Sequence, residues 1–206
     1  MPSPVPQSEI RAVDGEPLSA EAIAALEYLR TRSAKLGAAG IRERVRAAAQ
    51  ELENAVAAAP EAAVRQRPFA DKWNIAEVVD HIAQTQIRAA EELRHLMAGR
   101  RPPGPPVYEG LRSAASAWAP WAELVEGLRA ANRELVALLE SPPADGAAGP
   151  TAHTILVVNR TMADGRVTPQ IFVAELGWKE YALVQRVHLL EHRNQIKKLV
   201  AALAGG

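Results

Sequence analysis

Apolar residues recur at helical spacing in four separate stretches of this 206-residue chain, and this repetition limits the folds open to it. A spacing of three to four residues places the apolar side chains on one face of a helix, and that face must be buried against other helices. The four stretches are residues 41–59, 75–97, 120–140 and 174–204. They predict an all-α fold, a four-helix bundle in which each helix contributes one face to a common core.

Local signals mark where two of these helices begin. Asn74 and Glu77 have the pattern of a capping box just ahead of the second stretch. Pro120 suits the first turn of the third stretch, where its missing backbone N–H has no intrahelical partner to lose. These signals strengthen the prediction of long helices at both places.

The start of the chain departs from the bundle pattern. Residues 1–17 are polar and proline-rich, and we expect a flexible segment that lacks a secretory signal. An extra N-terminal helix is expected over residues 18–36, with Ser19 as its N-cap, before GAAG at 37–40 ends it. Residues 18–206 are then predicted to form a single domain, because a chain of this length supports one substantial core.

Two later segments interrupt the helical pattern. Residues 98–110, AGRRPPGPPVYEG, are stiff and proline-rich. They are long enough to cross from one end of a bundle to the other, which would make two neighbouring helices parallel. HTILVVNR and VTPQIFV are rich in β-formers and flank the turn signal ADG. A small β-hairpin near residues 153–173, packed on the bundle, is therefore expected.

Composition narrows the choice of partners and compartment. Lys plus Arg equals Asp plus Glu at 24 each, so no overall field steers the chain to nucleic acid or to an anionic membrane. The absence of cysteine excludes disulfides, thiolate zinc ligands and a cysteine nucleophile. No apolar run approaches the roughly 18 residues that span a bilayer. We expect a cytoplasmic protein with neither nucleic acid nor a membrane as its partner.

The stretch HLLEHRNQ, residues 188–195, carries most of the functional information. At about 100° per residue, setting His188 to zero places His192 at about 40° and Gln195 at about −20°, in the middle of the buried face. Buried polar groups need partners. Imidazole nitrogens one turn apart can share a divalent metal ion. The alternative is that each histidine bonds a neighbouring side chain or carbonyl and binds no metal.

Glu191 raises the question of a metallopeptidase. Together with His188 and His192 it completes the H-x-x-E-H pattern, in which the glutamate acts as general base. It points about 60° away from the histidine pair on the helix, however. No acidic residue follows His192 to serve as a downstream ligand. These observations argue against a peptidase.

A third ligand must come from upstream, where His81, His95, His153 and acidic residues are candidates. His81 lies at the edge of its apolar stripe, about 100° from the centre, so periodicity alone does not predict that it faces inward. His95 lies further along the same flank and is expected to be solvated. His153 begins the expected hairpin and is expected at the surface. The residues alone leave the third ligand open.

The stretch KWNIAEVVDHIAQTQ, followed about a hundred residues later by HLLEHRNQI, resembles the DinB/YfiT-like superfamily. The shared pattern is Trp-x-x-x-Glu-x-x-x-His on the second helix of a four-helix bundle and His-x-x-x-His-x-x-Gln-Ile on the fourth. The matching residues here are Trp73, Glu77, His81, His188, His192, Gln195 and Ile196. The resemblance covers roughly residues 41–203 and implies a divalent ion, zinc or nickel, bound by His81, His188 and His192. The extra N-terminal helix and the β-like segment at 151–173 depart from the family pattern. The resemblance therefore does not define the shape or the substrate of the pocket.

The resemblance implies a metal-dependent hydrolase or a transferase that uses a low-molecular-weight thiol, acting on a small-molecule substrate. Three neutral nitrogen ligands leave a coordination position open, as in catalytic sites. Gln195 is a candidate orienter of a ligand or a donor to substrate. Tyr181 and Trp73 could line the pocket, although aromatic residues at such positions are more often core. The alternative is a non-catalytic, stress-related metal-binding bundle. The sequence is also compatible with a homodimer.

Overall fold

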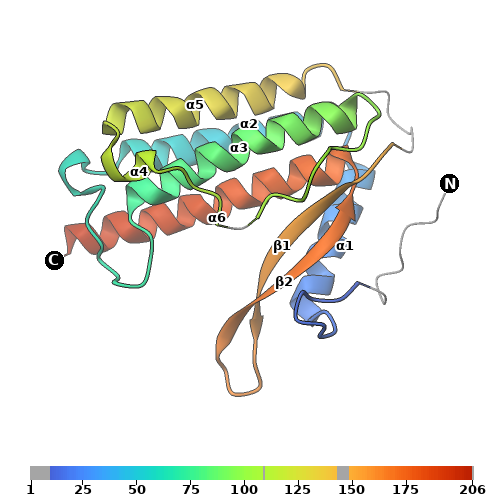
Figure 1. The fold of residues 1–206 in the computed structure, drawn as a ribbon, viewed down its shortest axis with the longest axis horizontal. Coiled ribbons are helices and arrows are strands. Elements are labelled where there is room, and N and C mark those ends of the chain that lie inside the picture. The colour runs from blue at the N-terminus through green and yellow to red at the C-terminus, as the bar shows by residue number, and fades with distance from the viewer. Residues whose placement is uncertain (1–9, 109, 143–148, 206) are drawn as a thin grey trace.

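The computed structural model describes residues 10–108, 110–142 and 149–205. Within these residues the chain forms six α-helices, one 3-10 helix and one two-stranded antiparallel sheet (Figure 1). The elements are α1 (Ala20–Lys35), α2 (Ala38–Ala57), η2 (Glu61–Ala63), α3 (Ile75–Met97), α4 (Ala115–Trp118), α5 (Trp121–Leu138), β1 (Ala152–Thr161), β2 (Val167–Leu176) and α6 (Trp178–Ala204).

Helices α2, α3, α5 and α6 form a four-helix bundle (Figure 1). Helix α3 packs against α5 and α6, and α2 packs against the same two helices. Helices α3 and α5 run in one direction, and α2 and α6 run in the other (Figure 1). The connection from α3 to α5 therefore returns along the bundle, as the length and stiffness of its proline-rich segment predicted.

The capping signals at helix starts are confirmed. At the start of α3, the Asn74 side chain accepts a hydrogen bond from the Glu77 backbone, and the Glu77 carboxylate accepts one from the Asn74 backbone. The Ser19 hydroxyl accepts from the backbone of Ala22 and caps α1. Pro120, which was expected in the first turn of α5, is instead its N-cap and makes no side-chain cap hydrogen bond. The side chains of Asn74 and Ser19 satisfy donors that the first helical turn leaves without partners.

Two helix boundaries differ from the prediction. Helix α2 begins at Ala38, so the break expected over 37–40 is confined to Leu36 and Gly37. Helix α6 begins at Trp178 rather than near 174, because the residues before it continue a strand. Gly177 ends that strand and is the N-cap of α6.

The hairpin is larger than predicted, and the all-α description is corrected here. Strands β1 and β2 have ten residues each. Gly165 in the turn between them has a φ of 80°, a left-handed conformation that glycine adopts without steric cost. One face of the hairpin is buried and packs against α1 and the start of α6. The apolar residues of this face are Ala152, Leu156, Phe172, Ala174 and Leu176.

Part of the stretch predicted to be flexible packs on the hairpin. Ala12 is buried and pairs with Phe172, and the Val13 backbone N–H donates to the Ile171 carbonyl at 2.8 Å. Residues 10–17 thus form a turn along the edge of β2. Residues 1–9 lie outside the described residues, and the division into 1–17 and 18–206 stays a prediction.

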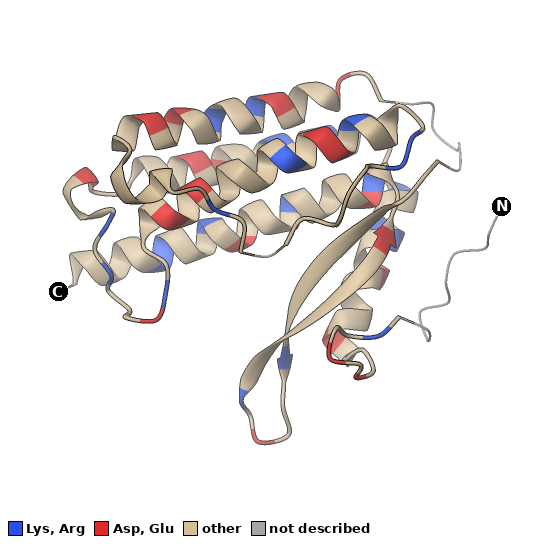
Figure 2. Ribbon diagram, in the orientation of Figure 1, with Lys and Arg blue, Asp and Glu red and all other residues tan. Residues whose placement is uncertain are grey.

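Charges of both signs are interspersed along the helices, whereas most of the hairpin carries neither (Figure 2). Among the described residues, no helix combines the length and the apolar character needed to cross a bilayer.

The core of the bundle is divided into two apolar clusters. On α3 one cluster ends at Ala83 and the other begins at Ala89, and on α6 the corresponding limits are Leu189 and Leu183. Four of the side chains buried between the clusters are polar. They are Thr85 and Gln86 on α3, Asn132 on α5 and Gln185 on α6, and we call these four residues the polar layer.

Candidate metal centre

Three histidines from two antiparallel helices meet beside the polar layer. His81 lies in the second turn of α3, and His188 and His192 lie one turn apart in the middle of α6. Their ring centroids are 4.4 Å apart for His188 and His192, 4.9 Å for His81 and His192, and 5.1 Å for His81 and His188. Among the described residues they form the one group of three or more histidine or acidic side chains that could hold a metal ion.

The Nε2 atoms of the three rings point at one another. His188 Nε2 lies 3.1 Å from His81 Nε2 and 3.0 Å from His192 Nε2. Zinc–nitrogen bonds of about 2.0–2.1 Å place two nitrogens about 3.3 Å apart in tetrahedral geometry and about 2.9 Å apart at a right angle. Both separations from His188 lie between these values, and the ligand atoms of all three rings lie within 4.8 Å of one another, so the cluster could hold a single ion.

Hydrogen bonds at the opposite ring nitrogens fix two of the three tautomers. His81 Nδ1 donates to the Leu111 carbonyl and His192 Nδ1 donates to the Gln195 side-chain oxygen, each at 2.7 Å. Both partners are carbonyl oxygens that can only accept, so the ring proton resides on Nδ1 and leaves Nε2 with a free lone pair. This is the tautomer that binds metal through Nε2. Gln195 thus contacts His192, and its role as an orienting residue stays a prediction.

Burial keeps all three rings neutral. It lowers the pKa of His81, lowers the pKa of His192 to about 4, and holds the pKa of His188 well below its usual range. The neighbouring histidines lower the pKa of His188 and His192 further, because adjacent positive charges repel. Neutral rings that aim lone pairs at one point favour a cation there. The donor set fits zinc or nickel, which imidazole nitrogen suits.

His81 is buried, although periodicity alone did not predict that it faces inward. It lies at the edge of the apolar stripe of α3, yet its residue is only 3% exposed. The reason is the segment Leu111–Arg112–Ser113, which we call the strap and which lies over this part of α3 (Figure 1). A ring that would face solvent on an isolated helix is therefore buried between the strap and α6.

The strap is held to α3 by polar contacts on either side of the His81 contact. The carboxylate of Asp80, only 2% exposed, accepts hydrogen bonds from the backbone and the hydroxyl of Ser113, both at 2.7 Å. The Arg112 guanidinium donates to Glu77 at 2.8 Å. These contacts fix the strap where the Leu111 carbonyl reaches His81.

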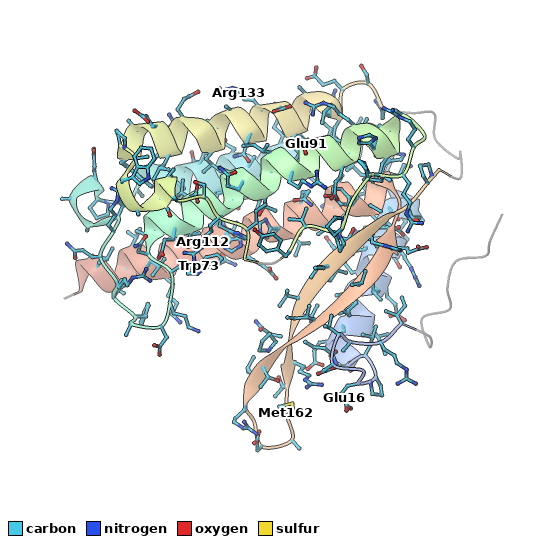
Figure 3. All side chains as sticks on the ribbon, in the orientation of Figure 1. Glu16, Trp73, Glu91, Arg112, Arg133 and Met162 are labelled. Carbon is cyan, nitrogen blue, oxygen red and sulfur yellow. The ribbon has the colours of Figure 1, made fainter. Side chains whose placement is uncertain are left out.

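Trp73 covers His81 from the start of α3. Its ring centroid is 4.9 Å from that of His81, and the Arg112 guanidinium lies 4.6 Å from the Trp73 ring centroid (Figure 3). Cation–π contact of this kind stabilises the packing of the strap. The suggestion that Trp73 lines the site agrees with this contact.

Tyr181 occupies a different position from the one suggested for an assisting residue. It is 1% exposed, and its hydroxyl donates to the carboxylate of the buried Glu92 at 2.7 Å. Burial raises the pKa of both groups. None of the hydrogen bonds or ring contacts among the described residues joins Tyr181 to a histidine. An assisting role for Tyr181 therefore stays a prediction.

The other candidate ligands lie outside the cluster. His153 is exposed on the hairpin, where it bonds Glu175 at 2.9 Å and Arg101 at 2.6 Å. His95 is half-buried near the end of α3, and Glu191 is exposed on the flank of α6. His153 is at the surface, as expected from the sequence, whereas His95, which was expected to be solvated, is half-buried.

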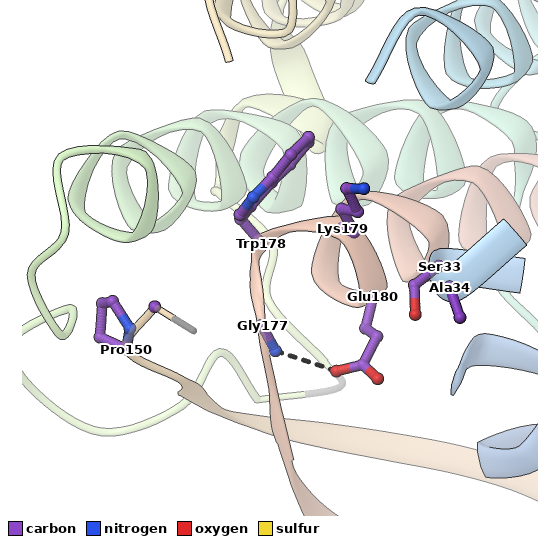
Figure 4. Close-up of a pocket in the computed structure, with 8 residues that line it drawn as sticks. Ser33, Ala34, Pro150, Gly177, Trp178, Lys179 and Glu180 are labelled. Atoms are coloured by element: carbon purple, nitrogen blue, oxygen red, sulfur yellow. Dashed lines mark hydrogen bonds between the residues drawn. The ribbon is translucent and has the colours of Figure 1, made fainter. Parts of the chain in front are cut away.

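A hollow at the start of α6 is separate from the histidines (Figure 4). The Gly177 backbone N–H donates to the Glu180 carboxylate at 3.0 Å, which completes the first turn of α6 although the N-cap has no side chain. Residues lining the hollow include Ser33, Ala34, Pro150, Trp178 and Lys179. None of the three histidines lines it.

Sequence reasoning missed the strap. Nothing in the sequence could single out the Leu111 carbonyl, because every residue has a main-chain carbonyl. Asp80 had a weak signal, since an acidic residue next to His81 on a largely buried helix requires a donor. Arg112 lies in a segment that composition marked only as a linker.

The comparison of this chain with protein-family models matched the DinB superfamily over residues 44–178. The matched span includes α3 with His81 and ends at the first residue of α6, before His188 and His192. No match was found among curated proteins or solved structures. Because the family model covers more than half of the chain, and the fold is a helical bundle, this protein belongs to the DinB superfamily.

Proposed function

We propose that His81, His188 and His192 bind a divalent metal ion, zinc or nickel, for chemistry on a small molecule. The reaction class is hydrolysis or transfer to a low-molecular-weight thiol. The observation that carries the proposal is the convergence of three Nε2 atoms from two helices, with separations of 3.0 and 3.1 Å around His188. Three histidine ligands leave coordination open to other molecules, which is typical of catalytic rather than structural zinc sites.

When bound, the ion would act as a Lewis acid and lower the pKa of a water molecule or thiol beside it. The chain's own residues hold the ligands in place. The Leu111 carbonyl and Gln195 keep His81 and His192 in the ligating tautomer. Trp73 and the strap cover His81 and exclude water from that side of its ring.

In the described part of the chain, the hydrogen bonds of the three histidines involve no acidic side chain. Asp80 is engaged by Ser113, and Glu92 by Tyr181. This arrangement supports a reaction that depends on the ion rather than on a side-chain nucleophile.

Metal binding is tested first, with protein stripped by a chelator and titrated with zinc and with nickel at fixed pH. We expect one ion per chain, and loss of binding in His188→Ala but not in the exposed control His153→Ala. A parent protein that binds neither ion stoichiometrically refutes the proposal.

Activity is tested next on the metal-loaded protein, with a panel of ester and amide hydrolysis and of thiol transfer. Turnover that disappears with the chelator and returns with the ion supports an enzyme. Stoichiometric metal without turnover across the panel favours the non-catalytic alternative. The thiol cosubstrate and a homodimer remain predictions, and light scattering coupled to gel filtration measures the second.

A further inference from the structure

Unpartnered polar atoms are concentrated at one level of the bundle. In the described residues, every buried side-chain nitrogen or oxygen without a hydrogen-bond partner belongs to the polar layer or to His188. The atoms are Thr85 Oγ1, Gln86 Nε2 and Oε1, Asn132 Oδ1, Gln185 Oε1 and His188 Nδ1. Buried polar groups in native proteins almost always have partners, so their concentration beside the histidines requires a reason.

Two of these atoms are complementary. With Nε2 of His188 facing the other two histidines, its Nδ1 is free to carry the ring proton and to donate. Gln185 Oε1 is an acceptor on the same helix, three residues earlier, and its residue is 4% exposed. Side chains three residues apart are neighbours on a helix surface. A bond between them would break no existing bond, since neither atom has another partner.

The same spacing already produces such a bond one turn further along α6. Gln195 lies three residues after His192, and its side-chain oxygen accepts from His192 Nδ1 at 2.7 Å. The sequence from Gln185 to Gln195, QRVHLLEHRNQ, places a glutamine three residues outside each histidine of the pair. The bond at one end shows that a glutamine three residues after a histidine can orient it on this helix, and Gln185 has the mirror-related position before His188.

We propose that Gln185 is the positioning residue of His188. Its side-chain oxygen accepts the Nδ1 proton of His188 in the metal-bound protein and keeps the Nε2 lone pair directed at the ion. The inference rests on the proposed metal site. Each of the three histidines then has one oxygen that orients it, from Leu111, Gln185 or Gln195. His188 is the central ring, so a proton on its Nε2 would block the site.

A positioning role and a structural role predict opposite effects of Gln185→Leu. Leucine has a similar volume and removes a buried acceptor that has no partner in the metal-free protein. The melting temperature of the metal-free variant should therefore stay unchanged or rise. Metal affinity should fall by about 10- to 100-fold, the usual consequence of losing a residue that orients a ligand.

The experiment compares zinc affinity, measured by competition with a chromophoric chelator, among four variants. Gln185→Leu and Gln195→Leu should both bind about 10- to 100-fold more weakly than the parent. Gln185→Glu keeps an acceptor and should restore most of the loss. The matched control is Gln86→Leu, which removes an equally buried, unpartnered glutamine of the polar layer that lies on α3 rather than on the helix of His188. Its affinity should equal that of the parent.

Nuclear magnetic resonance of the ¹⁵N-labelled, zinc-loaded protein reads the tautomer directly. We expect a slowly exchanging Nδ1 proton on His188 in the parent and its loss in Gln185→Leu. If Gln185→Leu does not fold, the spectrum of the parent and the affinity of Gln185→Glu decide. Absence of the His188 Nδ1 proton in the parent overturns the inference.

The two proposals fail differently. A parent that binds neither zinc nor nickel refutes the metal site and this inference with it. A parent that binds zinc while Gln185→Leu binds equally tightly overturns only the role of Gln185. Equal weakening by Gln86→Leu and Gln185→Leu also overturns it, because the polar layer as a whole would then be responsible.

Discussion

Asp80 makes no hydrogen bond to a metal-facing nitrogen, yet we expect Asp80→Ala to weaken metal binding. Its carboxylate accepts the backbone and hydroxyl hydrogen bonds of Ser113, both at 2.7 Å. Ser113 lies two residues after Leu111, whose carbonyl orients His81 at 2.7 Å. Without Asp80, the end of the strap loses its anchor and the carbonyl is no longer held beside the ring.

The magnitude follows from the burial and charge of these bonds. Hydrogen bonds to charged groups contribute about 1.5–3 kcal/mol each. Because the contact of Arg112 with Glu77 still holds the strap, we expect a total loss of about 2–4 kcal/mol in the free energy of unfolding. At about 2–4 °C per kcal/mol for a chain of this size, a 3 kcal/mol loss lowers Tm by roughly 6–12 °C. Metal affinity should fall about 10- to 100-fold, as for other residues that orient a ligand.

Two milder variants rank the contributions. Asp80→Asn keeps one acceptor and should show an intermediate loss, and Ser113→Ala removes only the hydroxyl bond and should show the smallest. Glu134→Ala, which breaks an exposed ion pair with Arg94, is the control and should cost less than about 1 kcal/mol with no change in affinity. Urea unfolding in chelator measures stability, and competition titration measures affinity. If Asp80→Ala loses stability but binds zinc as tightly as the parent, the strap does not orient His81.

Three further results are expected. His81→Ala should weaken zinc binding by at least about 10- to 100-fold in competition titration, whereas His153→Ala should not; the reverse result would assign the third ligand to the hairpin. In assays of any turnover, Glu191→Gln should cost far less activity than His188→Ala, and equal losses with metal retained would revive the metallopeptidase interpretation. Lowering the pH from about 6.5 towards 4 should destabilise the metal-free protein, because the unfolded chain binds more protons than the folded chain in this range. The pKa of His192, lowered to about 4, contributes at most about 3 kcal/mol of this loss. Urea unfolding across this range should therefore show a steeper decline for the parent than for His192→Gln, and equal slopes would contradict the assignment.

Apolar periodicity was sufficient to predict the bundle where it coincided with local end signals. Helix α3 matches its predicted limits of 75 and 97, because a capping box opens it and Gly99, with a φ of 70°, follows its last turn. The same periodicity misplaced the start of α6. The residues from Ala174 to Leu176 are compatible with both a strand and a helix, and only Gly177 separates the two elements.

In the candidate site, too, an arrangement within one helix could be predicted from the sequence, whereas a contact between distant segments could not. His188 and His192 could be paired from the sequence, because one helix fixes their spacing. The burial of His81 could not, because it depends on a strap that lies 30 residues later in the chain and meets the ring through a main-chain carbonyl. The resemblance to a known family identified His81 as the third histidine. A family motif includes such a residue even where the segment that buries it lies far away in the chain.

The polar layer gives a physical reason why the site lies where it does. A bundle of this length can be packed with apolar side chains throughout, and buried amides without partners lower its stability. Helices α3, α5 and α6 instead interrupt their apolar core once, between the two apolar clusters, at the level of the polar layer. The three histidines lie beside this interruption, and Gln185 belongs to it while His188 follows one turn later on the same helix. Departures from the rules of core formation are expected where a protein functions. Among the described residues, the buried side-chain atoms that lack partners belong to the polar layer and to His188, which is the arrangement that the proposed metal centre with its supporting residues would require.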